Sequence, residues 1–111
     1  MTVLVKVLIP AKIAESTQVT QYTATGVTTI IDKFTATNYS GSSATISVNL
    51  ITATGTASND NLIVKQRTLA ASETYIFPEL VGQILPSGGF ISTIAGTASA
   101  INMRVSGREV S

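Results

Sequence analysis

The regular alternation of apolar and polar residues is the feature that most restricts what this chain can fold into. In residues 44–50, Ala, Ile, Val and Leu take every second position, and Thr, Ser and Asn lie between them. Because successive side chains of a β-strand point to opposite faces of a sheet, this period of two predicts a half-buried strand. The same pattern recurs in residues 101–106. The side chains expected in the core from these two segments are Ile46, Val48, Leu50, Ile101 and Met103.

Turn-forming residues divide the chain into short apolar segments, spaced by roughly ten residues. The strands expected are residues 2–9, 17–24, 27–37, 44–52, 62–68, 73–77, 90–95 and 100–110. Residues 79–85 are the only helical candidate, although Gly82 weakens it. A succession of strands without helical crossovers predicts an all-β fold, namely an antiparallel β-sandwich. We expect the jelly-roll type, with an immunoglobulin-like sandwich as the alternative.

The N-terminal segment differs from the rest of the chain. Residues 2–9 form an apolar strand that ends at Pro10, and a connector follows. We therefore divide the chain into an N-terminal arm or strand, residues 1–16, and a single sandwich domain, residues 17–111. The arm is expected to pair with the edge of a neighbouring chain and to be dispensable for folding. Its candidate interface residues are Val3, Val5, Val7 and Ile9.

Residue usage excludes several classes of function. The 111 residues contain no cysteine and no histidine, which rules out disulfides, thiolate or histidine-based metal sites, and Ser-His-Asp catalysis. We expect no catalytic residue, no cofactor and no bound metal, so the protein is not expected to be an enzyme. The formal net charge of +1 gives no broad attraction to nucleic acid or to an anionic membrane, and neither is expected as a partner.

Charged residues make up only 12% of the chain, about half of the share usual in soluble domains. Hydroxyls and small apolar groups must then cover much of the surface, which is typical of a subunit that packs against other proteins. The most apolar stretch, residues 3–14, is too short for a membrane span and is interrupted by Lys6, Pro10 and Lys12. It is also a poor signal peptide, so we expect synthesis in the cytoplasm.

Three groups of residues could in principle form a ligand or catalytic site. Residues 58–61, Ser-Asn-Asp-Asn, contain a single acid, so an Asx-type turn is favoured over a calcium loop. The pair Gly88 and Gly89 lacks the lysine and the following helix of a phosphate loop. Hydrolysis of a glycoside needs two carboxylates across one cleft, and no aromatic platform accompanies any acid here. The carboxylates expected to be merely solvated or ion-paired are Asp32, Glu73, Glu79 and Glu109.

Asp32 is unusual because it alternates with apolar residues two positions away on either side, which places it on the inward face of its strand. There it would need a lysine, an arginine or a backbone donor as its partner. Lys65 and Arg67 lie two residues apart on one expected strand, so they share a face and are candidates for an intermolecular salt bridge. Tyr39 lies in a turn and is a further candidate contact residue.

Three segments resemble a known protein family. They are VTTIIDKFTATN from residue 27, ETYIFPELVGQILPSGGFIS from residue 73, and SAINMRVSGREV from residue 99. Together they are similar to the capsid staple proteins, also called decoration or cement proteins, of short-tailed bacteriophages related to epsilon fifteen. The chain length agrees with that family, and the likeness covers most of the chain from Val27 onward.

The resemblance implies a jelly-roll subunit on the exterior of a virion capsid, made in the host cytoplasm. Its partners would be the major capsid protein, whose neighbouring subunits it would clamp together, and a second copy of itself, with which it would form a homodimer. The alternative is a tail or baseplate module that binds a receptor or a glycan through a pocket around its tyrosines. The copy number in purified particles would separate the two, because a shell protein is present in many copies.

Overall fold

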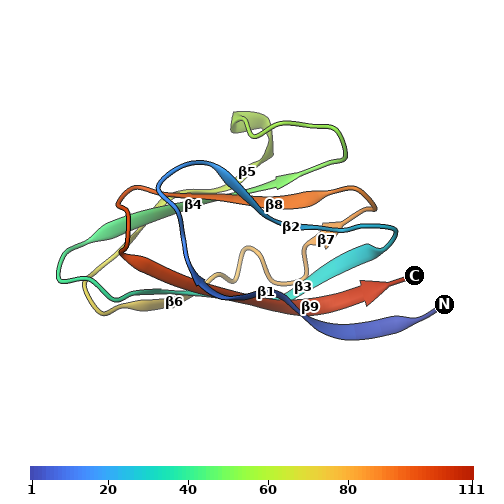
Figure 1. Ribbon diagram of the computed structural model, residues 1–111, viewed down its shortest axis with the longest axis horizontal. Helices are drawn as coiled ribbons and strands as arrows, with labels where there is room; N and C mark the ends of the chain where they lie inside the picture. Colours follow the sequence, from blue (N-terminus) through green and yellow to red (C-terminus); the bar gives the residue numbers. More distant parts are fainter.

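The structure, a computed structural model, describes all residues from Met1 to Ser111, and its regular secondary structure is β-strand apart from one 3-10 turn (Figure 1). The strands are β1 (Val3–Ile13), β2 (Val19–Thr23), β3 (Thr28–Asn38), β4 (Ala44–Ile51), β5 (Leu62–Leu69), β6 (Thr74–Ile76), β7 (Ile84–Leu85), β8 (Phe90–Ala95) and β9 (Ile101–Val110). A 3-10 turn, η1 (Asn59–Asn61), precedes β5. The fold contains no helix that combines the length and the apolar character of a membrane span.

The strands form two sheets that pack against each other as a β-sandwich. Sheet A has the strand order β1-β9-β3-β6, with β7 also paired to β3, and sheet B has the order β2-β8-β4-β5. Every pairing is antiparallel. When β7 is set aside, the first, eighth, third and sixth strands form one sheet, and the second, seventh, fourth and fifth form the other. This is the strand order of a jelly roll, so the expected fold class is confirmed.

The inward side chains of both sheets form one apolar core. Phe34 and Phe77 are fully buried in it, with ring centroids 4.9 Å apart in an edge-to-face arrangement. Four of the predicted core residues are buried as expected, namely Ile46, Val48, Ile101 and Met103. Leu50 packs against the core but is only half-buried, whereas the next residue, Ile51 at the end of β4, is 1% exposed.

The sequence-based placement of Asp32 is wrong. The register of β3 against β9 shifts between Ile31 and Lys33, so the alternation of faces breaks at this point. Ile31 and Phe34 both face the core, whereas Asp32 is exposed on the outer face of sheet A. Its carboxylate forms an ion pair with Arg108, with 2.9 Å between Asp32 Oδ1 and Arg108 Nη2. The partner is thus an arginine, but the pair lies on a solvated face.

β1 is an integral strand of sheet A and not a separate arm. It pairs with β9 of the same chain on both sides of Pro10, with register shifts before and after Ile9. Leu8 and Ile9 are buried in the core that both sheets enclose. β1 therefore belongs to the sandwich domain, and the expected division at residue 16 does not hold. Because Leu8 and Ile9 lie in the core, we now expect removal of β1 to destabilise the domain.

Residues 79–85 do not form the expected helix. Gly82 has a left-handed backbone, with a φ of +84°, which glycine adopts readily and which interrupts a right-handed helix. The segment instead follows β3, where Gly82 N donates to Ile31 O at 2.7 Å and Ile31 N donates to Gln83 O at 3.0 Å. The short strand β7 then continues this pairing with β3.

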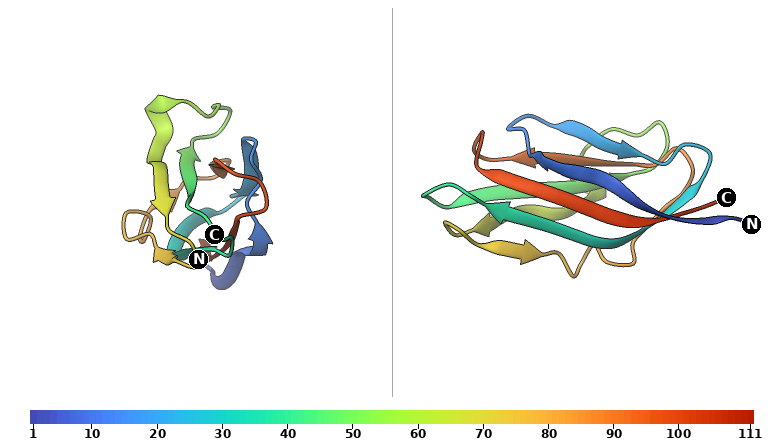
Figure 2. Two further views of the ribbon diagram at one scale, coloured as in Figure 1. Left: turned by 90° about the vertical axis from the view of Figure 1, so that its left-hand side faces the viewer. Right: turned by 60° about the horizontal axis from the view of Figure 1, so that its bottom comes forward.

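Both ends of the chain lie at the same end of the sandwich, where β1 and β9 run side by side past the other strands (Figure 2). Thr2 and Ser111 exchange backbone hydrogen bonds of 3.0 and 2.9 Å there. The two strands therefore stay paired up to the chain ends. We call this end of the sandwich the terminal end.

Candidate interaction surfaces

Three of the four sheet edges are poorly suited to pairing with another chain. At one edge of sheet A, β6 and β7 have only three and two residues. At one edge of sheet B, β2 has five residues and a register shift. The other edge of sheet B, β5, is interrupted at Gln66, whose φ is +47°, between Lys65 and Arg67. Short, bulged and charged edges resist association, so β1 is the remaining candidate.

β1 presents a regular, open edge over residues 3–7. Its register against β9 is unbroken there, and one lysine is the only charged residue in this stretch. Thr2 and Ser111 exchange both of their backbone hydrogen bonds, so by alternation the even-numbered residues of β1 bond to β9 in the same way. The N–H and C=O groups of the odd-numbered residues point away from β9. These free backbone groups belong to Val3, Val5 and Val7.

An apolar patch lies on the outer face of sheet A beside this open edge. The strand registers place Val5, Arg108 and Ile30 in one row on that face, and Ile84 of β7 continues the row. Val5 and Ile84 have 81% and 58% of their surface exposed. We define the outer patch as Val3, Val5, Val7, Ile30, Ile84 and Val110. Arg108 lies among these residues, and its ion pair with Asp32 neutralises its charge.

A polar cluster ties the two sheets together near the terminal end. The Tyr22 hydroxyl, from β2, contacts the Glu109 carboxylate of β9 and lies 2.7 Å from Thr29 Oγ1 of β3. Lys6 Nζ lies 3.3 Å from Glu109 Oε2. The hydrogen bond from Tyr22 is the main cause that lowers the pKa of Glu109. Burial of the phenol, together with its bond to Glu109, raises the pKa of Tyr22 to about 12.

The raised pKa of Tyr22 predicts a specific loss of stability in alkali. An unfolded tyrosine has a pKa of about 10, so the folded state holds the phenolic proton more tightly and Tyr22 stabilises the fold below that pH. This contribution should be lost as the pH rises from about 10 to about 12. Urea unfolding across this window should show a steeper decline for the wild type than for Tyr22→Phe, which has no phenolic proton. Equal slopes would contradict this role for Tyr22.

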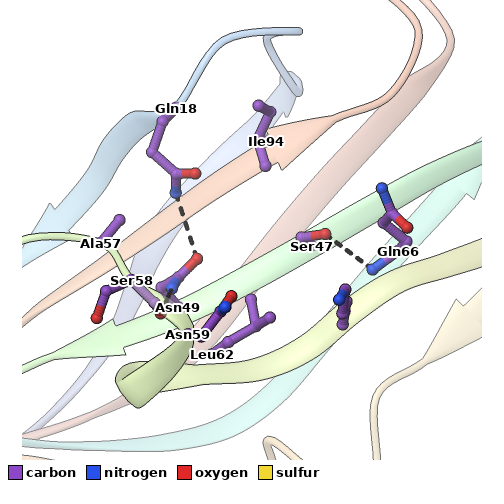
Figure 3. Close-up of a pocket in the computed structure, with 10 residues that line it drawn as sticks. Gln18, Ser47, Asn49, Ala57, Ser58, Asn59, Leu62, Gln66 and Ile94 are labelled. Carbon is purple, nitrogen blue, oxygen red and sulfur yellow. Dashed lines mark hydrogen bonds between the residues drawn. The ribbon is translucent and has the colours of Figure 1, made fainter.

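A shallow depression of about 200 Å³ lies on the outer face of sheet B (Figure 3). Figure 3 shows Ser47 and Asn49 on β4, with Ile94 on the neighbouring β8. Gln18, in the loop just before β2, and Gln66 of β5 stand on either side, and the loop that leads into β5 closes one end. Three of the ten lining residues are apolar, so the depression is lined mainly by amides and hydroxyls.

The predicted interface residues do not gather on one surface. Val3, Val5 and Val7 lie together on β1 and are exposed. Ile9 is 1% exposed and belongs to the core instead, because the register shift before it turns both Leu8 and Ile9 inward. Tyr39 is half exposed in the turn after β3, which lies at the end of the sandwich opposite the terminal end (Figure 1).

Lys65 and Arg67 do not share the expected face. The left-handed backbone of Gln66 between them breaks the alternation of β5. Lys65 lines the depression on sheet B, whereas the Arg67 guanidinium lies 4.0 Å from the centroid of the Tyr75 ring on β6. The stacking of Arg67 on Tyr75 joins an edge of sheet B to an edge of sheet A.

Residues 58–61 form a turn that its own side chains hold in place. Ser58 Oγ accepts from Asp60 N at 3.3 Å, and Asn61 Oδ1 accepts from Ser58 N at 3.1 Å. These bonds satisfy backbone donors at the start of η1 as a capping box, so a serine takes the place of the Asn or Asp that an Asx-type turn would use. The structure contains no group of three or more acidic, cysteine or histidine side chains that could hold a metal ion.

Comparison with protein-family models, with curated proteins and with solved structures finds no match. The basis for a functional proposal is therefore the chain itself. Four observations form this basis: the open β1 edge, the outer patch, the depression on sheet B and the resemblance carried by three segments of the sequence.

Proposed function

We propose that this protein is a structural virion protein that binds the outside of an icosahedral phage capsid and staples neighbouring major-capsid subunits. The observation that carries the proposal is the open β1 edge beside the outer patch, on a chain with few charges. A regular edge strand with exposed valines tends to pair with another protein chain, so we expect a specific partner to cover it. The resemblance to capsid staple proteins suggests a phage capsid as the surface that is bound, and jelly rolls are common in viral capsid domains.

The β1 edge is suited to a second copy of the same chain. If two β1 strands run antiparallel about a two-fold axis at Val5, then Val5 faces its own copy and Val3 faces the partner's Val7. Each of these valines has its N–H and C=O on the open edge, so every pair can exchange both hydrogen bonds. A contact of this kind uses the same surface on both copies, so the assembly stops at a dimer. It would join the two A sheets into one continuous sheet.

Pairing in this way would place two outer patches side by side. The exposed valines of one β1 would continue those of the other, so that one apolar surface extends across both copies. A surface of this extent can contact two capsid subunits at once, one on each side of a seam. Because the dimer links the two contacts, each holds the other at a high effective concentration, and release requires both to open. Reinforcement of the shell then needs complementary surfaces and no chemical step.

Heating of shells with and without the protein tests this function. Shells that lack it should assemble at the correct size but release their DNA at a lower temperature than complete shells. Addition of purified protein should restore the release temperature in step with the fraction of sites filled, because a ligand stabilises the state that it binds. Ile63→Ala is a matched control, since this exposed side chain lies on β5, away from sheet A. This variant should restore the shells fully.

The competing function is a receptor- or glycan-binding module of a tail or baseplate. Two results together would favour this function over stapling of the shell. Shells without the protein would resist heat as well as complete shells, and particles without it would fail to adsorb to cells. A low copy number in purified particles would point the same way, because a staple must be present in a fixed, high ratio to the shell subunit.

A further inference from the structure

The depression on sheet B is one half of a longer groove. A second depression of about 230 Å³ adjoins it and shares Ser47, Gln66 and Ile94. Together they follow the outer face of β4, from the η1 turn at one end to Ser16 and Gly96 at the other. The groove lies on the opposite sheet from the outer patch. A molecule could therefore occupy it while sheet A is covered by a partner.

The floor of this groove is held in place by a hydrogen-bond network. Asn49 is 3% exposed, and its Nδ2 donates to Asn61 Oδ1 at 2.7 Å and to Ser58 O at 3.0 Å. Gln18 Nε2 donates to Ser92 Oγ at 2.7 Å and lies 3.4 Å from Asn49 Oδ1. Buried polar groups that are fully satisfied keep their neighbours in one arrangement. The groove is thus formed before any ligand binds, as is usual for a binding site.

Polar groups along the rim have no partner within the chain, and they face solvent. They are the side-chain amides of Gln66 and Asn59, the Oε1 atom of Gln18 and the ammonium group of Lys65. Gln66 has a left-handed backbone conformation, and its N–H donates to Ser47 Oγ at 2.8 Å. A residue other than glycine is strained in this conformation, and such strain recurs at ligand-binding sites. The free amide of Gln66 borders both halves of the groove.

The chemistry of the groove excludes most ligand classes. Its floor lies in the middle of sheet B, where β4 and β8 each pair on both sides, so no backbone groups are free to bind a peptide strand. Three apolar residues among ten are too few for an apolar ligand. A single lysine without an arginine is a weak site for a phosphate group. No carboxylate lines either half, so a cation has no ligands there.

We propose that this groove binds a neutral oligosaccharide. Side-chain amides donate and accept hydrogen bonds at once, which matches adjacent sugar hydroxyls. Ile94, Leu62 and Ala57 offer apolar contact to the C–H faces of a sugar ring. No aromatic side chain is present to stack on the ring, so a single site binds weakly, with a Kd on the order of 1 mM. Many copies on one shell would compensate through multivalency. This gain in affinity from multivalency rests on the proposed function, whereas the site itself does not.

Titration of the isolated protein with maltotriose and with triacetylchitotriose tests the site. The side-chain amide signals of a nitrogen-15-labelled sample report on the groove residues directly. We expect saturable shifts of the Gln66, Gln18 and Asn59 amide signals with at least one of the two sugars. Triethylene glycol has no adjacent hydroxyls and should leave these signals unchanged at the same concentration.

Gln66→Gly is the decisive variant. Glycine adopts a φ of +47° without strain, so this change should keep the fold or stabilise it. Loss of the amide should weaken sugar binding about tenfold, as expected for the loss of one or two hydrogen bonds. Gln83→Ala is the matched control, because it removes an exposed amide from a segment that borders sheet A. It should bind the sugars as the wild type does.

The proposal is overturned if neither sugar gives saturable shifts, if Gln66→Gly binds as tightly as the wild type, or if triethylene glycol shifts the same signals equally. The titration uses the isolated protein and needs no shell. Its failure would therefore leave the stapling function intact, and failure of the shell-heating experiment would not change the expected titration.

Discussion

Replacing Phe34 with alanine should lower the free energy of unfolding by about 3–5 kcal/mol, the usual cost of removing a buried phenylalanine. Phe34 is fully buried on β3 and packs edge-to-face against Phe77, at 4.9 Å between ring centroids. The Phe77 ring in turn lies 4.7 Å from that of Tyr75, on which Arg67 stacks. Loss of the Phe34 ring would therefore leave a cavity and remove one end of this row of packed side chains.

Urea unfolding followed by circular dichroism measures this loss, since a domain of this size is expected to unfold in one step. Ile84→Ala is the matched control on the same sheet, because its side chain is 58% exposed. It should change the free energy of unfolding by no more than about 0.5 kcal/mol. If Phe34→Ala costs less than about 1 kcal/mol, the core has been assigned to the wrong face of β3.

The strands could be located from the sequence because most of them bury one face and expose the other. β9 shows this directly, since Ile101, Met103 and Val105 alternate with polar residues and are all buried. The order of the strands in each sheet could not be derived in the same way. It depends on pairings between distant residues, such as Thr2 with Ser111, for which local composition holds no signal.

The errors of the sequence-based account occur where a strand departs from regular geometry. One extra residue in a strand moves all that follow to the other face. Such a shift in β3 exposes Asp32, and the left-handed Gln66 separates Lys65 from Arg67. Neither irregular strand carries a glycine or a proline at the point of irregularity, although Gly107 of β9 lies opposite the shift in β3. For residues 79–85 a signal existed, since Gly82 marked the weak point of the expected helix.

The two candidate surfaces differ in how far the sequence could predict them. Three of the four interface residues predicted on the N-terminal strand, Val3, Val5 and Val7, are exposed together, because they occupy alternate positions of one edge strand. The groove on sheet B had no counterpart in the sequence-based account. Its polar side chains come from β4, β5, the loop before β2 and the loop before β5, and Gln18, Asn49 and Gln66 are far apart in the chain. Only the fold brings them together.

The central proposal is that the open edge of β1 binds another copy, and Val5→Pro should strongly weaken that pairing. Proline removes the N–H of Val5, which points to the open edge and has no partner within the chain. Edge strands tolerate proline at such positions, so the fold should persist. In a two-fold pairing centred on Val5, both copies lose this donor at once. Dimerisation should therefore weaken about a hundredfold, as expected for two lost hydrogen bonds.

Two control variants separate backbone pairing from other effects. Val5→Ala keeps the N–H and should retain most of the pairing. Leu4→Pro removes a donor that bonds to β9 within the same chain, so it should lower the free energy of unfolding, which Val5→Pro should not.

Sedimentation equilibrium of the wild type and Val5→Pro, together with their occupancy on shells, is the most direct test. A wild-type dimer, a folded Val5→Pro monomer and a marked loss of shell occupancy are the predicted results. A Val5→Pro protein that dimerises and coats shells as the wild type does would contradict the account.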